Sequence, residues 1–176
     1  MSPASELSEK GFKAVVDIDL NGTFHVAKAA FPFLAKPGGC ILNISAPQAT
    51  VAYPYQAHVS AAKAGVEMLT RSLAFEWGAL GIRVNAIVPG PVAETEGMRR
   101  LTPTKSSEDA TSQAVPLRRY ARAGEIASLA AYLATDAQHF TFTTYTINYT
   151  NYIHQFFFLC WAESFFAASY PSLNMS

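Results

Sequence analysis

Two short apolar segments, separated by one long helical pattern, limit what this chain can fold into. The segments are "CILNIS", residues 40–45, and "IRVNAIVPG", residues 82–90, and turn residues bound both of them. Between them, apolar side chains recur every three or four residues from Val59 to Trp77, which is the spacing of an amphipathic helix. Strand, helix and strand in this order predict a parallel sheet whose strands are buried on both faces.

The flanking segments extend the same alternation. Apolar positions at helical spacing from residue 11 to about residue 34 predict one long helix, and a shorter helix is predicted over residues 124–134. Residues 92–113 are polar and irregular, which predicts a mobile segment over the edge of the sheet. The fold class is therefore α/β with a parallel sheet.

One pair of charges is predicted to face water. Glu67 and Arg71 lie four residues apart in the middle helix, so they are expected as an exposed ion pair on its polar side.

The composition changes abruptly after Asp136. Residues 137–176 contain no Lys, Arg or Gly and are rich in Thr, Tyr and Phe. Because neither the helical nor the strand period holds there, no element of the sheet is expected beyond this point. We therefore divide the chain into a partial domain, residues 1–136, and an atypical aromatic-rich tail, residues 137–176, that is foreign to the fold.

Charge and cysteine usage exclude several classes of function. The 13 basic and 13 acidic side chains cancel, so no charge pattern points to a nucleic acid or an anionic membrane as partner. Cys40 and Cys160 match no metal-ligand spacing, and no metal site is expected. The first residues lack a secretory signal, and polar residues interrupt the most apolar segment, residues 153–170, so we expect an intracellular protein without a membrane span.

Chemistry is expected where the predicted strands end. In parallel sheets ligands bind at the carboxyl ends of the strands, which here means near Ser45 and near Pro89. Lys63 lies among small residues at the start of the middle helix, and Asp19 lies on a helix expected to pack beside it. A buried ammonium needs an anionic or polyol partner, so we expect Lys63 to pair with Asp19, a ribose diol, or both.

Four blocks of the sequence resemble one enzyme family. In order along the chain they are "DLNGTF", "ILNIS", "SAAKAGVEMLTRSLAFEWGALGIRVNAIVPGPV" and "AGEIASLAAYLATD". Their order and spacing are similar to the central and C-terminal part of short-chain dehydrogenases/reductases, over about 70% of the chain. The resemblance implies an α/β fold with part of a Rossmann-like doubly wound parallel sheet, the C-terminal half of that domain. It also implies an oligomer formed through the two long helices.

The chain departs from that family at the positions that carry its usual chemistry. Most members have a tyrosine four residues before the lysine and a serine thirteen residues before the tyrosine, where this chain has Val59 and Ala46. Asp19 replaces a family asparagine. Because the hydroxyl acid that reduces a ketone is absent, alcohol and ketone chemistry is disfavoured.

One branch of the family combines these losses with a retained lysine. The peroxisomal type of 2,4-dienoyl-CoA reductase also resembles this chain in "HVSAAKAGV" and "TEGMRRL". The resemblance implies that Asp19 and Lys63 form the catalytic pair, and that the reaction is the NADPH-dependent reduction of 2,4-dienoyl-CoA to 3-enoyl-CoA. Two alternatives remain open: another short-chain reductase of an enoyl or carbonyl substrate, and a non-catalytic fragment that oligomerises.

The resemblance also implies binding residues. The residues expected to hold NADPH are Lys63, Pro89, Gly90, Val92 and Thr95, and those expected to contact the acyl-CoA are Ser8 and Arg100. Ser45 is expected as a strand-end hydroxyl rather than an acid, and His58 as a partly exposed residue at a helix start.

The family pattern is incomplete at both ends of the chain. No Gly-x-x-x-Gly-x-Gly phosphate turn occurs in the sequence, and the aromatic tail stands where the family has its closing strand. We therefore expect a chain truncated at the N-terminus, altered at the C-terminus and incomplete as an enzyme. The branch implies a peroxisomal location, but the chain ends in "LNMS" and not in a Ser-Lys-Leu address, which otherwise predicts the cytoplasm.

Overall fold

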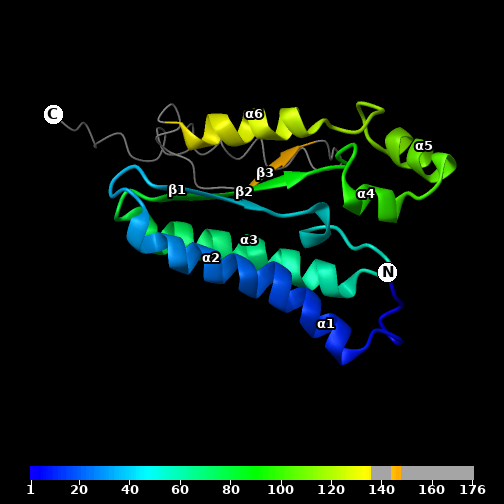
Figure 1. Cartoon of the computed structure of the whole chain (residues 1–176), viewed down its shortest axis with the longest axis horizontal. Helices are drawn as coiled ribbons and strands as arrows, with labels where there is room; N and C mark the ends of the chain where they lie inside the picture. The colour runs from blue at the N-terminus through cyan, green and yellow to red at the C-terminus, as the bar shows by residue number, and fades with distance from the viewer. Residues whose placement is uncertain (136–143, 148–176) are drawn as a thin grey trace, which may run out of the picture.

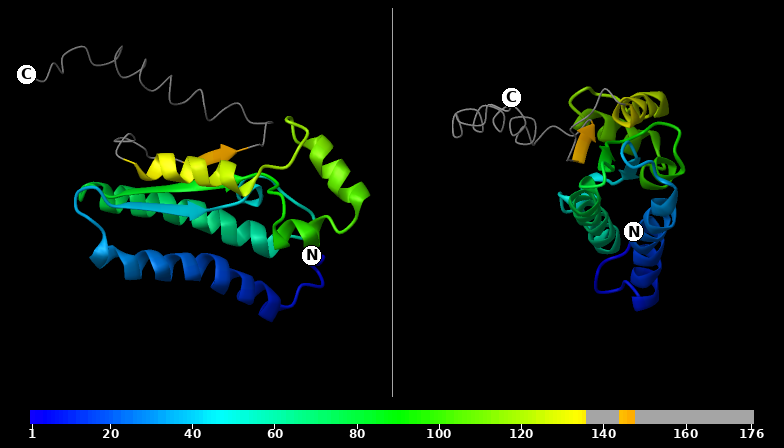
Figure 2. Two further views of the ribbon diagram at one scale, coloured as in Figure 1. Left: turned by 45° about the horizontal axis from the view of Figure 1, so that its top comes forward. Right: turned by 90° about the vertical axis from the view of Figure 1, so that its left-hand side faces the viewer.

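The computed structural model describes residues 1–135 and 144–147, which form three layers. A parallel sheet lies in the middle, with α6 (Ala123–Ala134) on one face and the pair α2 (Gly22–Ala30) and α3 (Ala57–Gly78) on the other (Figures 1 and 2). Helices on both faces of a parallel sheet confirm the predicted doubly wound α/β fold.

The sheet has three strands in the order β1-β2-β3, and all of them are parallel. Their bounds are β1 (Cys40–Ile44), β2 (Arg83–Pro89) and β3 (Thr144–Ile147). Residues 84–88 of β2 are no more than 3% exposed, as predicted for a central strand. For β1 the prediction of complete burial is wrong, because in the described sheet β1 pairs on one side only and Ile44 is 51% exposed.

Strand β3 was not predicted. Its four residues, Thr144–Ile147, pair with β2 from Ala86 to Pro89, so the expectation of no sheet element beyond residue 136 is wrong for this segment. The segment is too short to show a strand period, and no Gly or Pro bounds it. Residues 136–143 and 148–176 lie outside the described structure, and the boundary at residue 136 stays a prediction.

The predicted long helix near the N-terminus is present, but it is not uniform. It runs through α1 (Glu9–Val15), the segment η1 (Val16–Asn21), α2 and a 3₁₀ turn, η2 (Phe31–Phe33). Segment η1 is a π-helix, in which the Gly22 N–H bonds the carbonyl of Asp17, five residues earlier. Asp19 therefore lies in a wide turn, a feature that is frequent at functional sites.

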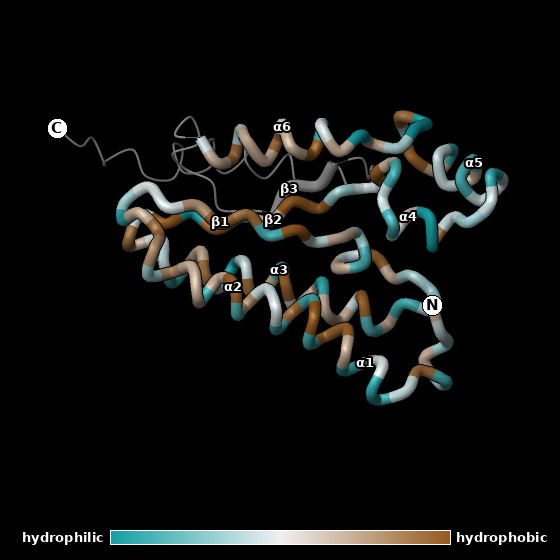
Figure 3. Tube along the Cα trace, in the orientation of Figure 1, coloured by the Kyte–Doolittle hydropathy of each residue, from teal (hydrophilic) through white to brown (hydrophobic). Residues whose placement is uncertain are grey.

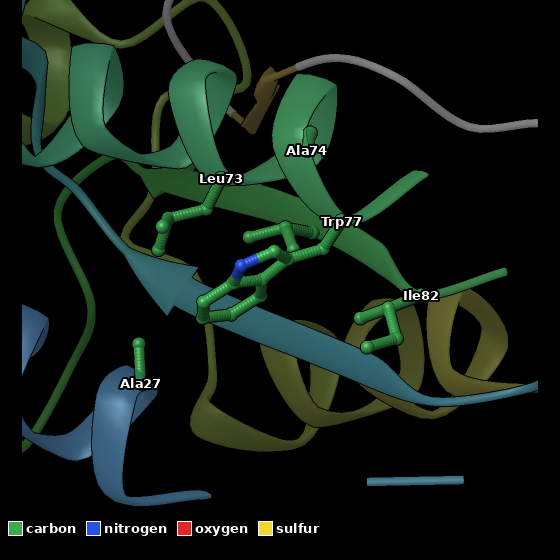
Figure 4. Close-up of a cluster of buried hydrophobic side chains, with 6 residues drawn as sticks. Ala27, Leu73, Ala74, Trp77 and Ile82 are labelled. Atoms are coloured by element: carbon green, nitrogen blue, oxygen red, sulfur yellow. The ribbon is translucent and has the colours of Figure 1, made fainter. Parts of the chain in front are cut away.

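Apolar side chains of α3 form the core against the sheet. Leu73, Ala74 and Trp77 are no more than 9% exposed, and Leu73 and Trp77 point from α3 toward the strands (Figure 4). The ring centroids of Trp77 and Phe31 lie 4.7 Å apart, and this contact joins the first helical run to the core. Figure 3 shows the matching apolar residues along β1 and β2.

The predicted ion pair on α3 differs from its prediction. Glu67 does not face water: it is 4% exposed, so the prediction that both partners of the Glu67–Arg71 ion pair are exposed is wrong for the carboxylate.

Although α3 has 22 residues, no helix in the described part of the chain is long and apolar enough to cross a membrane.

The predicted mobile segment at residues 92–113 is instead ordered as two helices. These are α4 (Glu96–Leu101) and α5 (Lys105–Ala114), which lie beyond the ends of the β1 and β2 arrows in Figure 1. The Thr95 hydroxyl accepts a hydrogen bond from the Met98 N–H at the start of α4, and Thr104 and Ser107 form a capping box at the start of α5. Caps therefore begin these helices, which lack the apolar stripe that sequence patterns detect.

Polar contacts fix both ends of α6. At its C-terminus the Arg83 guanidinium, from β2, donates to the carbonyls of Leu133 and Thr135. At its N-terminus the Glu125 carboxylate accepts from the Arg122 N–H at 2.8 Å and pairs with Arg119. The hydrogen bonds from Arg119 and the Arg122 backbone lower the pKa of Glu125 to about 2.

We expect the Glu125 cluster to make folding depend on acid. Because the pKa of Glu125 is about 2 in the fold and 4.5 in a free side chain, its contribution is complete above pH 4.5 and is lost as the pH falls through 2. Urea unfolding of the parent chain and of Glu125→Gln across this range measures the effect. The stability difference between the two should shrink as the pH falls, and a difference independent of pH would contradict the assignment.

The turn that leads from α3 into β2 requires glycine. Gly81 has a φ of 71°, and a Cβ at this position would lie 2.5 Å from the Pro37 Cβ and 2.9 Å from its Cα. We expect Gly81→Ala to lower the free energy of unfolding by about 1–3 kcal/mol, measured by urea denaturation. Gly78→Ala is the matched control, because a Cβ on Gly78 would meet nothing within 4 Å. Equal effects of the two variants would contradict this reading of the turn.

Candidate functional site

The structure brings Lys63 and Asp19 together at the carboxyl end of β1. The Lys63 Nζ lies 3.6 Å from Asp19 Oδ2, and the two side chains are 20% and 28% exposed. Nζ also donates to the carbonyl of Ile44, the last residue of β1, at 3.3 Å. The predicted pairing of this lysine with this aspartate is therefore present, in a partly buried position at the predicted edge of the sheet.

A glycine allows the pair to form. Segment η1 packs directly on α3, and a Cβ on Gly65 would lie 2.7 Å from the Cδ2 atom of Leu20, the residue after Asp19. The absence of a side chain at Gly65 therefore lets η1 approach α3 closely enough for Asp19 to reach Lys63. The small residues around Lys63 thus have a packing role, since Ala62 in the same turn is fully buried.

Ser45, the residue after β1, is buried in the protein. Its backbone N–H donates to the Ile87 carbonyl at 2.9 Å, and its hydroxyl donates to Glu67 Oε1 at 3.1 Å. The side chain is 3% exposed. As expected, Ser45 is a strand-end hydroxyl and not a free acid.

The loop after β2 borders the same edge. Pro89 and Gly90 are partly exposed there, while the backbone around Val92 is fixed by a bridge to Ala121. The Thr95 hydroxyl donates to the Val92 carbonyl at 2.9 Å and caps α4. Both of these bonds hold the shape of the loop, so Thr95 has a structural role in addition to the predicted contact with a cofactor.

The two predicted substrate contacts, Ser8 and Arg100, have local partners. The Ser8 hydroxyl caps α1 by accepting from the Gly11 N–H at 3.1 Å. Arg100 pairs with Glu96 at 2.8 Å, and its side chain is 79% exposed. Neither residue is among the described contacts of Lys63, and their roles toward an acyl-CoA stay predictions.

Two unpaired polar atoms near this edge were not predicted. His58 Nδ1 and Gln48 Oε1 are buried without a hydrogen-bond partner, one in the first turn of α3 and the other in the 3₁₀ turn η3 (Pro47–Ala49) after β1. His58 is partly exposed as a whole, as expected, although this one nitrogen is buried. The burial of a single atom produces no repeating pattern in the sequence, so these two atoms could not be predicted from it.

The residues present fit one end of a nicotinamide cofactor. An ammonium has three donors, and Lys63 uses one on Ile44 while remaining 20% exposed, so it can still donate to a ribose hydroxyl. The partly exposed Pro89-Gly90 backbone lies at the same edge. The sequence contains no glycine-rich turn for the pyrophosphate. Within the described residues, no three His, Cys, Asp or Glu side chains gather to hold a metal ion.

Comparison with known proteins gives one family for most of the chain. Residues 1–147 match the family model described as enoyl-(acyl carrier protein) reductase. The chain is 43% identical over 136 residues to the peroxisomal 2,4-dienoyl-CoA reductase, (3E)-enoyl-CoA-producing, of Pongo abelii, a match that covers 77% of this chain and 47% of that protein. The probable 2,4-dienoyl-CoA reductase, (2E)-enoyl-CoA-producing, of Bacillus subtilis is 46% identical over 137 residues, covering 76% and 54% respectively.

Solved structures agree with this assignment. The gluconate 5-dehydrogenase of Burkholderia cenocepacia J2315, in complex with NADP and tartrate, matches with a TM-score of 0.78 and 30% identity. The match covers 84% of this chain and 58% of that one. The chain thus spans about half the length of the relatives that it resembles in sequence.

The contact at Gly65 can be tested by filling it. Gly65→Val places branched carbon atoms where Leu20 packs, so we expect η1 to move off α3 and the free energy of unfolding to fall by about 1–3 kcal/mol. Gly78→Val is the control, because it puts the same side chain into open space on the same helix. Urea denaturation of both variants measures the difference. An equal loss of unfolding free energy in both would show that the close packing of Leu20 on Gly65 does not contribute to stability.

Proposed function

Because the chain belongs to the short-chain dehydrogenase/reductase family, we propose that it carries the active-site half of an NADPH-dependent 2,4-dienoyl-CoA reductase. One observation carries the proposal. The Lys63 ammonium lies 3.6 Å from the Asp19 carboxylate at the ligand-binding edge of the sheet, and Val59, one helical turn before the lysine, offers no hydroxyl. The printed names of the two sequence relatives support the same reaction.

The missing hydroxyl separates the candidate substrates. Reduction of a ketone must protonate the carbonyl oxygen as it becomes an alcohol, and Val59 cannot supply that proton. Reduction of a conjugated thioester adds hydrogen to carbon and returns the thioester oxygen unprotonated. It therefore needs a positive charge near that oxygen and a proton source near carbon, which is what a lysine and an aspartate can provide.

The proposed reaction balances as one hydride and one proton. NADPH, when bound, supplies the hydride that adds at C5 of the dienoyl thioester. Lys63 donates to the ribose, and its positive charge favours the enolate that the thioester becomes. Asp19 holds the ammonium in place and positions the water that delivers a proton to C2, which leaves the double bond between C3 and C4.

The assembly and the location are parts of the same proposal. Large apolar side chains are exposed on the helices of one layer, including Ile18 at 73%, Val26 at 70% and Phe75 at 83%. Exposed apolar surface of this kind favours a homo-oligomer formed through these helices. The name of the Pongo abelii relative gives a peroxisomal location, and we extend that location to this chain.

The activity can be tested with purified protein. NADPH is titrated by its fluorescence, and its oxidation is then followed with a 2,4-dienoyl-CoA. We expect Lys63→Ala to weaken NADPH binding and Asp19→Asn to lower kcat by about a hundredfold or more. Absence of NADPH binding at high micromolar concentration would overturn the proposal for this chain.

A matched control lies two residues from Asp19. Asp17 is on the same π-helical segment and pairs with an exposed lysine, Lys13, so Asp17→Asn removes a similar ion pair outside the site. We expect Asp17→Asn to leave kcat unchanged. Analysis of the product distinguishes 3-enoyl-CoA, which we propose, from the 2-enoyl-CoA named for the Bacillus subtilis relative.

A further inference from the structure

A buried carboxylate lies one helical turn beyond Lys63, and the proposed reaction does not use it. The Glu67 side chain is 6% exposed. Its Oε1 accepts from the Ser45 hydroxyl at 3.1 Å, and its Oε2 lies 3.7 Å from an Arg71 nitrogen. Burying a carboxylate against a single hydroxyl and one distant, half-exposed guanidinium is costly compared with an apolar residue of the same size. The position therefore calls for an explanation other than stability.

Glu67 belongs to a polar stripe on α3 that contacts the end of β1. Side chains at residues 63, 67 and 70 follow each other along one face of the helix, because they are four and three residues apart. They meet three consecutive residues of the chain: Lys63 bonds the Ile44 carbonyl at 3.3 Å, Glu67 bonds Ser45 at 3.1 Å, and Thr70 bonds the Asn43 side chain at 2.8 Å. Glu67 and Thr70 are buried, where core-facing positions are normally apolar.

These contacts set the relative position of the helix and the strand end. Apolar packing tolerates small sliding movements, whereas a hydrogen bond fixes both a distance and a direction. The carbonyl that orients the Lys63 ammonium belongs to Ile44, and the next residue, Ser45, is held by the Ile87 carbonyl on one side and by Glu67 on the other. The Ile44 carbonyl and the Ser45 N–H belong to one peptide unit, so if Ser45 loses Glu67 only the bond to Ile87 still restrains the carbonyl that contacts Lys63.

We propose that Glu67 is a positioning residue, which holds the end of β1 so that the Ile44 carbonyl orients the Lys63 ammonium toward Asp19 and the cofactor ribose. Its importance for catalysis rests on the proposed function, but its effect on Lys63 does not. Glu67 itself touches neither the substrate nor the cofactor.

The test observes the Lys63 ammonium directly, without cofactor or substrate. In the full ¹⁵N-labelled chain, an ammonium held by Ile44 and Asp19 exchanges slowly with water and gives a ¹H–¹⁵N signal, which Lys63→Arg assigns by removing it. We expect Glu67→Leu to abolish this signal. Glu67→Gln keeps an oxygen that can accept from Ser45, so the signal should persist in that variant.

Two further variants keep the result clear. Val66→Ala truncates a fully buried side chain on the same turn of α3 and should lower stability while leaving the Lys63 signal intact. Ser45→Ala deletes only the hydroxyl and should abolish the signal as Glu67→Leu does, which covers the case in which Glu67→Leu does not fold. A Lys63 signal unchanged in Ser45→Ala and Glu67→Leu, or absent from the parent chain, would overturn the proposal.

The reductase proposal is judged separately. If NADPH binds, Glu67→Leu should raise its dissociation constant while Glu67→Gln restores it. If NADPH does not bind, the reductase proposal fails for this chain, and the ammonium signal still decides whether Glu67 positions Lys63.

Discussion

The parallel pairing of β1 with β2 is the constraint on which the rest of the molecule depends. Two neighbouring parallel strands cannot be joined by a tight turn, so the chain must return across the sheet before the second strand begins. The 22 residues of α3 make that return. As a result, the first turns of α3 lie at the edge where β1 and β2 both end, and a lysine placed there meets the carbonyl of Ile44.

The sequence was sufficient for the elements that have a strong period. The bounds of α3 and β2 agree with the predictions within about two residues, because long apolar stripes and a wholly buried strand leave clear patterns. The pairing of Asp19 with Lys63 also followed from the sequence, since the fold class brings the start of one helix beside another. Helices α4 and α5 could not be predicted from the sequence, because they begin at threonine caps and bury no apolar stripe.

Other features depend on contacts between distant residues, which periodicity cannot reveal. Glu67 and Arg71 have the spacing of an exposed ion pair, yet the hydroxyl of Ser45, 22 residues away in the sequence, lies beside Glu67 and the carboxylate is buried. Similarly, β1 is only partly buried, with Ile44 exposed, because burial of a strand depends on its neighbours in the sheet. In the sequence, Gly65 looks like one of several small residues near Lys63. Its specific role becomes visible only in the structure, where Leu20 packs against it.

The π-helical segment η1 also determines how long the first helical run must be. A π turn holds one more residue than an α turn, so residues on either side of η1 differ in phase by about 100° from a regular α-helix. Loss of a single residue from Val16–Asn21 would allow a regular helix to form across the segment. If the lost residue follows Asp19, the side chain of Asp19 would rotate by about 100° relative to α2 and away from Lys63, and α1 would rotate with it. The number of residues in this helical run is therefore constrained as well as their identity.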